Sequence, residues 1–359
     1  MRQAQMYADT GDADSRGYEI EVVAVNDLAD KANMEYLLRY DSVYRTRISA
    51  DNKNTQIYAD EGALVMGGKR IKYLSEKDPA KLPWKELGID VVVEATGFFA
   101  SVEKSQAHLL AGAKRVVITA PLREQSQIDA DTDTQMHADK AETVLLGINE
   151  DKLKNCTISS NASCTTNAAS PLIAILDEAI GVEKAVLNTV HAYTATQSLV
   201  DAPSGKKPAR PNGRSGGGFR EGRAAAVNII PSSTGAALAL AKAYPKLEGK
   251  FDGISLRVPV VCGSIADITF IAKRDTSAEE VNEILRNAAK EPRWQGIFSA
   301  SNDELVSSDI VGASEGAIAE LSMTRVVGGN LVKVLVWYDN EAGYANTLVK
   351  HVLEAGKHI

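Results

Sequence analysis

The chain has 359 residues, which is enough for two domains that each have their own hydrophobic core. With 44% hydrophobic and 24% charged residues its composition is that of a soluble globular protein, and its net charge of −7 argues against a nucleic-acid-binding surface. No apolar run is long enough to cross a bilayer, and the first residues lack the apolar segment of a signal peptide. We therefore predict a cytoplasmic protein without nucleic-acid or membrane partners.

The three cysteines, Cys156, Cys164 and Cys262, are an odd number and lack the spacing of metal ligands. This pattern suits a reducing compartment and argues against a disulfide scaffold. We predict no metal site.

Strand and helix patterns alternate over about the first 160 residues. Residues 20–27 read as a strand that ends in Asp27, where a doubly wound sheet would suit a carboxylate bonding ribose hydroxyls, although an ordinary strand-ending turn is the alternative. Gly67-Gly68 indicates a hairpin turn. Further expected elements are a helix at 34–39, strands at 90–97, 115–121 and 143–147, and a helix at 101–111. The alternation predicts a parallel α/β sheet that binds a ligand at its carboxyl edge.

The stretch 159–167 carries the strongest candidate nucleophile, Cys164. Ser163 is a suitable N-cap for a helix that begins at the cysteine. The N–H groups and dipole of the first helical turn would favour the thiolate and lower the pKa of the thiol. A buried structural cysteine is the alternative, and a nucleophilic one needs a base.

His191 follows an expected strand at 185–190 and is the candidate base. An imidazolium there would stabilise the thiolate, and an imidazole would move protons during carbonyl chemistry. A structural histidine is the alternative.

Basic and hydroxyl residues in the second half could bind anions. Residues 201–223 read as a basic, glycine-rich loop, solvated rather than a polyanion-binding arm, in which Arg220 and Arg223 could aid an anionic substrate. Hydroxyls and a glycine at 231–237 precede an expected helix and make a plausible phosphate seat. Arg257 lies on an expected strand at 251–261. A helix at 278–289, a strand at 331–338 and a closing helix complete the expected elements.

The motifs at 160–167 and 191–194, together with 25–27, 94–97, 228–237, 256–259 and 337–341, resemble phosphorylating glyceraldehyde-3-phosphate dehydrogenases from about residue 19 to the end. The resemblance implies a Rossmann-like doubly wound parallel sheet domain plus an α+β catalytic domain. The first would be an N-terminally incomplete NAD-binding domain at 1–163, closed by a C-terminal helix at 341–359, and the second would span 164–340. It further implies a homotetramer acting in glycolysis.

The resemblance also assigns roles to residues. Cys164 would attack the aldehyde of glyceraldehyde 3-phosphate, with His191 as base, and inorganic phosphate would cleave the resulting thioester. The substrate-phosphate ligands would be Thr194 and Arg257, aided by Arg220, and the seat for attacking phosphate would be Ser163, Thr165, Thr234 and Gly235. The NAD-contacting positions would be Asp27, Lys77, Thr96, Gly97, Thr119 and Asn340. A carboxylate at residue 27 would favour NAD over NADP, because it repels a 2′-phosphate.

Several positions depart from the family pattern. The family's first strand and its glycine-rich turn have no counterpart, and residues 2–5 align with the helix that would follow them. A misplaced start codon and a truncated product both stay open as explanations. Lys77 replaces the usual Arg, Ala168 a frequent second Cys, and Ala342 the usual Trp, and the loop at 205–219 is longer than usual. Two other functions stay open: an erythrose-4-phosphate dehydrogenase, and a catalytically impaired paralogue that acts as a binding protein.

Overall fold

The computed structural model describes residues 20–44, 57–122, 141–204 and 218–359. Residues 1–19, which include the segment at 2–5, and most of the long loop at 205–219 therefore lie outside the described residues. The chain divides into two compact units. Unit 1 holds residues up to 142, 153–160 and 348–359, and unit 2 holds 143–152 and 161–347. The predicted functional domains, with their boundary after residue 163, stay a prediction.

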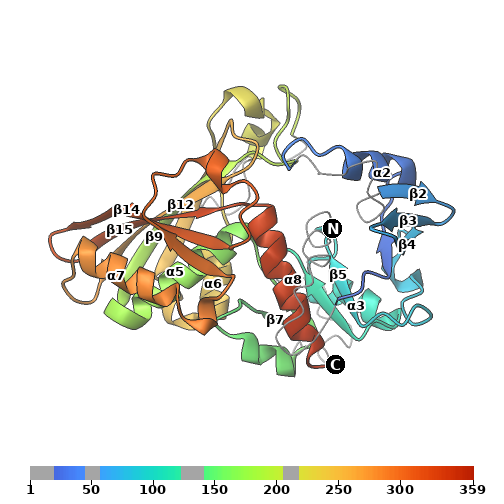
Figure 1. The fold of residues 1–359 in the computed structure, drawn as a ribbon, viewed down its shortest axis with the longest axis horizontal. Helices are drawn as coiled ribbons and strands as arrows, with labels where there is room; N and C mark the ends of the chain where they lie inside the picture. Colours follow the sequence, from blue (N-terminus) through green and yellow to red (C-terminus); the bar gives the residue numbers. More distant parts are fainter. Residues whose placement is uncertain (1–19, 45–56, 123–140, 205–217) are drawn as a thin grey trace. The chain divides into compact units, whose positions relative to one another are not determined.

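The first sheet of unit 1 has four strands in the order β1-β4-β3-β2. Their bounds are β1 Ala24–Asn26, β2 Ile57–Asp60, β3 Ala63–Met66 and β4 Lys69–Leu74. The pair β1 and β4 is parallel and the other pairs are antiparallel. The predicted turn at Gly67-Gly68 is confirmed: both residues have positive φ, 57° and 77°, which glycine adopts without steric cost. Helix α2 (Lys31–Arg39) lies beside β2, and Leu38 packs in the core of this sheet (Figure 1).

The second sheet of unit 1 has the order β5-β6-β8-β7, with β5, β6 and β8 parallel. The bounds are β5 Val91–Glu94, β6 Arg115–Ile118, β7 Ala141–Thr143 and β8 Ile158–Ser160, with helix α3 at Val102–Leu110. Strands β5 and β6 are rich in apolar residues, as predicted for buried parallel strands. Among the described residues no strand pairs with the outer edge of β1 or of β5. The predicted α/β class is confirmed, with the parallel strands divided between two sheets.

The strand predicted at 143–147 is wrong. Strand β7 ends at Thr143, and the chain turns instead of continuing. The side chain of Asn149 causes this turn: its Oδ1 accepts a hydrogen bond from Leu145 N at 2.8 Å, and its Nδ2 donates to Thr143 O at 2.9 Å. Both backbone groups are thereby removed from strand pairing.

Unit 2 is built on one seven-stranded sheet in the order β10-β11-β9-β12-β15-β14-β13. The strands are β9 Val182–Ala192, β10 Ile230–Ser233, β11 Phe251–Val258, β12 Ser264–Ala272, β13 Phe298–Ser301, β14 Ala317–Val327 and β15 Leu331–Tyr338. The pairs β11–β9 and β13–β14 are parallel and the remaining pairs are antiparallel. The strands predicted around residues 185, 251 and 331 are confirmed as β9, β11 and β15.

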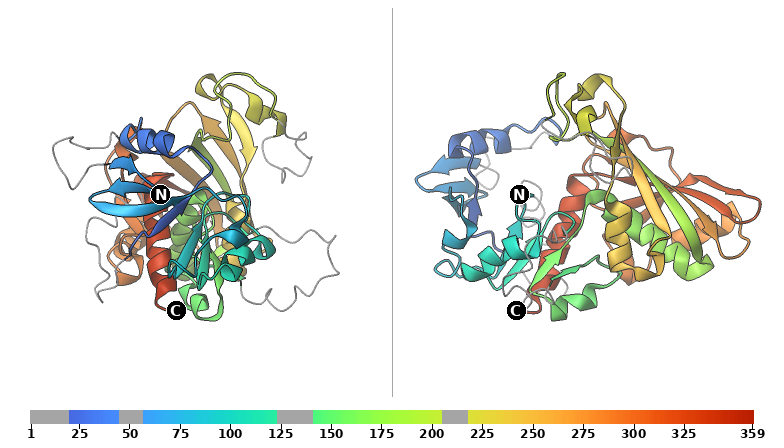
Figure 2. Two further views of the ribbon diagram at one scale, coloured as in Figure 1. Left: turned by 90° about the vertical axis from the view of Figure 1, so that its right-hand side faces the viewer. Right: turned by 180° about the vertical axis from the view of Figure 1, so that it is seen from behind.

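Helices α5, α6 and α7 cover one face of this sheet (Figures 1 and 2). Their bounds are α5 Cys164–Ile180, α6 Ala236–Ala243 and α7 Ala278–Ala288, and α8 spans Ala342–Gly356. Short 3-10 helices are η2 Pro79–Lys81, η3 Glu150–Asn155, η4 Gly218–Gly222, η5 Ala225–Val227, η6 Pro245–Leu247, η7 Pro292–Trp294 and η8 Ser307–Ile310. One core cluster joins α5 to the sheet through residues such as Leu172, Ile268 and Val334. Within the described ranges, no helix is long and apolar enough to cross a bilayer.

Candidate active site

Cys164 is the first residue of α5, as predicted, and a strained turn presents it. Ser163 is the N-cap, and its Oγ accepts a hydrogen bond from Thr166 N at 3.2 Å. The preceding residue, Ala162, is fully buried and has φ 54°, a left-handed conformation that costs a residue with a Cβ roughly 1–2 kcal/mol. This strand–turn–helix arrangement places the thiol at the helix N-terminus.

Two side chains hold that turn, and the sequence analysis assigned neither of them a role. Asn167 Nδ2 donates to Asn161 O at 2.8 Å and to Ser163 O at 3.0 Å. Tyr344 Oη donates to Ala162 O at 3.0 Å. These bonds satisfy the backbone carbonyls of the turn and offset the strain at Ala162. The sequence signal for Asn167 was an amide side chain three residues after the cysteine, just before a run of mostly small and apolar side chains in α5.

His191 lies at the end of β9 and faces the thiol. Its Nε2 is 3.4 Å from Cys164 Sγ. Burial lowers the pKa of His191 to about 3, and the positive charge of Arg257 acts in the same direction. The histidine side chain is therefore a neutral imidazole at neutral pH, the form that can accept a proton from the thiol.

The thiol is also neutral in this arrangement. Burial raises the pKa of Cys164, and the charge of Arg257 and hydrogen bonds from Thr165 oppose the shift without outweighing it. The expectation that the helix N-terminus lowers this pKa is therefore wrong for the chain without ligand, because desolvation of the thiolate dominates. In this arrangement burial favours the uncharged forms of both the thiol and the imidazole.

Arg257 is brought to His191 by the register of two parallel strands. Residues 257 of β11 and 191 of β9 are direct partners. The Nη1 atom of Arg257 lies 2.7 Å from His191 Nδ1 and donates to Ala192 O at 3.1 Å. The predicted anion ligand thus touches the predicted base.

A hydroxyl network beneath the pair was not predicted. Tyr338 Oη lies 2.9 Å from Thr165 Oγ1 and 2.7 Å from Thr189 Oγ1, and its ring packs edge-on against that of His191 with centroids 5.8 Å apart. The Thr165 hydroxyl, which belongs to the predicted phosphate seat, thus already bonds Tyr338. The sequence signal for Tyr338 was a tyrosine at the end of a strand in which apolar residues alternate with others.

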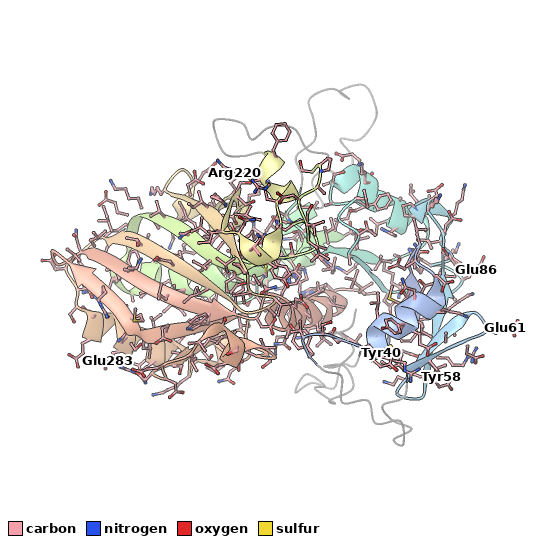
Figure 3. All side chains as sticks on the ribbon, turned by 90° about the horizontal axis from the view of Figure 1, so that it is seen from above. Tyr40, Tyr58, Glu61, Glu86, Arg220 and Glu283 are labelled. Carbon is pink, nitrogen blue, oxygen red and sulfur yellow. The ribbon has the colours of Figure 1, made fainter. Side chains whose placement is uncertain are left out.

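The other anion-binding candidates lie at turns of unit 2. Thr194 Oγ1 is 2.9 Å from Thr196 Oγ1, and its backbone N–H donates to Gln197 Oε1 at 2.9 Å. Thr234 Oγ1 accepts from Ala236 N at 3.2 Å, with Gly235 as N-cap of α6. Arg220 is exposed in η4, and no hydrogen bond joins it to the catalytic pair in the described part of the chain (Figure 3).

In unit 1, Asp27 lies immediately after β1, as predicted. Its Oδ1 accepts from Ala29 N at 2.8 Å. The neighbouring Asn26 was quoted in the sequence only as part of a motif, yet it makes two bonds to one residue: Nδ2 donates to Glu76 O and Oδ1 accepts from Glu76 N, both at 2.9 Å. Asn26 thereby fixes the backbone just before Lys77, whose exposed side chain is a predicted cofactor contact.

Thr96, Gly97 and Thr119 gather at the carboxyl ends of β5 and β6, where a parallel sheet binds ligands. Glu94 joins them: its Oε1 accepts from Thr96 N at 2.7 Å and from the Thr96 hydroxyl, and its backbone O accepts from Thr119 N at 3.0 Å. This buried carboxylate has no predicted role, although it is the charged residue of the otherwise apolar strand β5.

Two further buried side chains hold Glu94. His108 Nε2 donates to Glu94 Oε2 at 3.0 Å, and Trp84 Nε1 donates to His108 Nδ1 at 3.1 Å. Because Nδ1 accepts, the ring is the neutral tautomer protonated at Nε2. Burial alone would raise the pKa of Glu94, but hydrogen bonds from His108 and Thr96 outweigh burial and hold the pKa below its usual value.

Asn340 lies in unit 2, between β15 and α8. Its Oδ1 accepts from Gly263 N at 3.2 Å and from Ser264 Oγ at 2.9 Å. These two donors fix the orientation of the amide, so Nδ2 is the group left to donate to a ligand. In the described part of the chain no group of three or more His, Cys, Asp or Glu residues has the arrangement of a metal site.

The comparisons with known proteins agree with this geometry. The family model described as "Glyceraldehyde 3-phosphate dehydrogenase, C-terminal domain" matches residues 163–340, and the one described as "Glyceraldehyde 3-phosphate dehydrogenase, NAD binding domain" matches residues 9–102. The chain is similar to the glyceraldehyde-3-phosphate dehydrogenase of Clostridium pasteurianum, with 42% identity over 92% of this chain and 90% of the relative. The enzymes of that name from Streptomyces coelicolor (40%; 96% of this chain and 93% of the relative) and Thermotoga maritima (43%; 92% and 90%) are similar to it as well. The chain belongs to the glyceraldehyde-3-phosphate dehydrogenase family.

Proposed function

We propose that this chain is an NAD-dependent, phosphorylating glyceraldehyde-3-phosphate dehydrogenase of glycolysis. The observation that carries the proposal is the 3.4 Å approach of Cys164 Sγ to His191 Nε2 at the N-terminus of α5, with an arginine beside the pair. A thiol, a neutral imidazole and a cation are the groups needed to add a nucleophile to an aldehyde that carries a phosphate.

The proposed cofactor is NAD, and the residues present fit it. Asp27 offers a carboxylate at a strand end, Thr96 and Thr119 offer hydroxyls at the carboxyl edge of a parallel sheet, and Asn340 offers an amide donor that suits a carboxamide oxygen. Lys77 and Gly97 complete the proposed set. When bound, NAD supplies the acceptor for the hydride that leaves the substrate carbon.

In the proposed mechanism Cys164 attacks the aldehyde carbon, and a C–S bond forms. His191 Nε2 takes the thiol proton and passes it to the former carbonyl oxygen, which gives the thiohemiacetal hydroxyl and leaves His191 neutral again. The resulting thiohemiacetal gives up its hydroxyl proton to His191 as the carbon is oxidised to a thioester. Inorganic phosphate then attacks the thioester carbon. The C–S bond breaks with the Cys164 sulfur as leaving group, and 1,3-bisphosphoglycerate forms.

Two anion seats are proposed around the pair. Thr194 and Arg257, aided by Arg220, would hold the phosphate of the substrate. The attacking phosphate would sit at Ser163, Thr165, Thr234 and Gly235, near the N-termini of α5 and α6, where free N–H groups favour an anion. Since the Thr165 hydroxyl bonds Tyr338, its share in that seat would come from its backbone N–H.

We propose a homotetramer in the cytoplasm. The face of the seven-stranded sheet opposite the helices carries exposed apolar side chains, among them Val186 on β9 and Ile254 on β11, exposed by 61% and 54%. Such a face is a usual mark of association. The free cysteines support a reducing compartment.

The decisive experiment measures NADH formation from glyceraldehyde 3-phosphate with and without inorganic phosphate. Phosphate-dependent turnover is expected, with erythrose 4-phosphate a poorer substrate. Faster turnover of erythrose 4-phosphate would move the assignment to that aldehyde. A folded protein that binds NAD but shows no turnover of either aldehyde would refute the proposal.

A further inference from the structure

Glu94 engages hydrogen-bond donors at the carboxyl ends of β5 and β6. Its Oε1 accepts from Thr96 N at 2.7 Å and from the Thr96 hydroxyl. Its backbone O accepts from Thr119 N at 3.0 Å and from the Thr119 hydroxyl at 3.3 Å. The Thr96 oxygen in turn accepts from Phe98 N at 3.1 Å. The backbone N–H groups of Thr96, Phe98 and Thr119, and both hydroxyls, are therefore bonded within the chain.

The hydrogen bonds on the other side of Glu94 have a fixed direction. The indole N–H of Trp84 can only donate, so His108 Nδ1, 3.1 Å away, must accept. The ring hydrogen of His108 then lies on Nε2, which donates to Glu94 Oε2 at 3.0 Å. Both oxygens of Glu94 thus receive N–H donors, as an ionised carboxylate requires. Because Trp84, His108 and Glu94 are all buried, water does not compete for these bonds.

This direction decides what the exposed hydroxyl of Thr96 can offer a ligand. Its hydrogen goes to Glu94 and one of its lone pairs receives Phe98 N, so it can only accept a further hydrogen bond. The bond to the carboxylate is charge-assisted and about twice as strong as a neutral one, so a ligand does not readily reverse it. A ribose hydroxyl can donate to such an oxygen. A pyrophosphate oxygen carries no hydrogen at neutral pH and would meet a lone pair.

We propose that Glu94, held by His108 and Trp84, is a positioning residue that makes Thr96 an acceptor for a ribose hydroxyl of the cofactor. The inference deepens the proposed function, on which it rests, because it says which part of NAD this strand end recognises. Backbone N–H groups at a turn can bind an anion, but those of Thr96 and Phe98 are already bonded. The pyrophosphate must therefore find its donors at other residues.

The test compares the affinity of the full chain for NAD with its affinity for NAD analogues that each lack one ribose hydroxyl. In the parent protein, one analogue should bind more weakly than NAD by about two- to tenfold, the net value of one hydrogen bond. Thr96→Val removes the acceptor and keeps the shape of the side chain, so this ratio of affinities should fall to about one. Thr96→Ser keeps the hydroxyl and should retain the parental ratio.

Glu94→Met examines the positioning residue itself. It removes both acceptor oxygens, so the Thr96 hydroxyl is free to turn its hydrogen outward, and the ratio should again fall towards one. A merely structural role would weaken the binding of NAD and of the analogue equally and leave the ratio unchanged. Glu320→Met is the matched control, because this buried carboxylate of unit 2 accepts in the same way from the Ser322 hydroxyl and from Trp337 Nε1. It should keep the parental ratio.

The outcomes separate this inference from the proposed function. A parental ratio in Thr96→Val, or in folded Glu94→Met, would overturn the inference, while NAD binding and the proposed function would stand. A parent protein that binds every analogue as tightly as NAD would overturn it in the same way. Absence of NAD binding by the parent protein would overturn both. If Glu94→Met does not fold, the comparison of Thr96→Val with Thr96→Ser decides alone.

Discussion

The catalytic pair of unit 2 and the strand-end residues of unit 1 are positioned in different ways. Cys164 and Arg257 each contact His191 directly, because a helix start and the register of two long strands bring them together. In unit 1, Asn26 bonds the backbone of Glu76, next to Lys77, and Glu94 bonds Thr96; both holding residues belong to strands. Substitutions in the first region should therefore alter turnover. Substitutions in the second should alter NAD affinity, even at residues that do not themselves touch the ligand.

The largest expected effect is that of Cys164→Ala. It removes the nucleophile, so phosphate-dependent NADH formation should be abolished. The thiol is small and its polar contacts in the described part of the chain are with His191 and Thr165, so the free energy of unfolding should change by about 1 kcal/mol. Steady-state turnover and chemical denaturation measure the two effects. Retained turnover would refute the thiohemiacetal assignment.

His191→Asn should slow turnover by roughly two to four orders of magnitude, the usual contribution of a general base. NAD affinity, measured by fluorescence titration, should stay within a few-fold of the parent value, because the change lies in the catalytic pair. A large loss of NAD affinity with unchanged turnover at saturation would break the distinction between the two regions.

Acid should destabilise both units through one buried histidine in each. Burial lowers the pKa of His191 in unit 2 and of His351 in unit 1 to about 3, from 6.5. The unfolded chain therefore binds protons first as pH falls, and stability is lost between about pH 6.5 and pH 3, by about 1.4 kcal/mol per pH unit for each histidine.

His351→Gln tests this expectation away from the catalytic pair, since His351 lies in unit 1, where its Nε2 is 2.8 Å from the Ser159 hydroxyl oxygen. Denaturation at a series of pH values should show a shallower loss of stability below pH 6.5 than in the parent. An unchanged slope would show that His351 does not stay neutral in the folded state.

The sequence predicted the parts of the site that depend on local pattern. Ser163 was identified as the N-cap, Cys164 as the first residue of its helix and His191 as the end of a strand, because each has a short-range signal. The contact between Arg257 and His191 could not be predicted, because it depends on the register of two strands whose partners are 66 residues apart. The strand predicted at 143–147 failed for a similar reason, since one side chain, Asn149, captures the backbone groups that a strand would pair.

The smallest effect, and the sharpest test of the comparison, is expected for Asn26→Ala. The change removes both side-chain bonds to Glu76 and frees the backbone before Lys77. Stability should fall by about 1 kcal/mol, the net value of one or two such bonds. NAD affinity should fall several-fold, while turnover at saturating NAD stays unchanged.

A double-mutant cycle shows whether Asn26 acts through Lys77. If it does, the losses of NAD affinity in Asn26→Ala and Lys77→Ala are not additive, and the double variant is little worse than Lys77→Ala alone. Asn33→Ala serves as a matched control, because the side chain of this exposed asparagine on α2 has no hydrogen bond to any described residue, and its backbone N–H bonds Asp30. Additive losses would mean that Asn26 supports the strand end as a whole and does not act through Lys77 in particular.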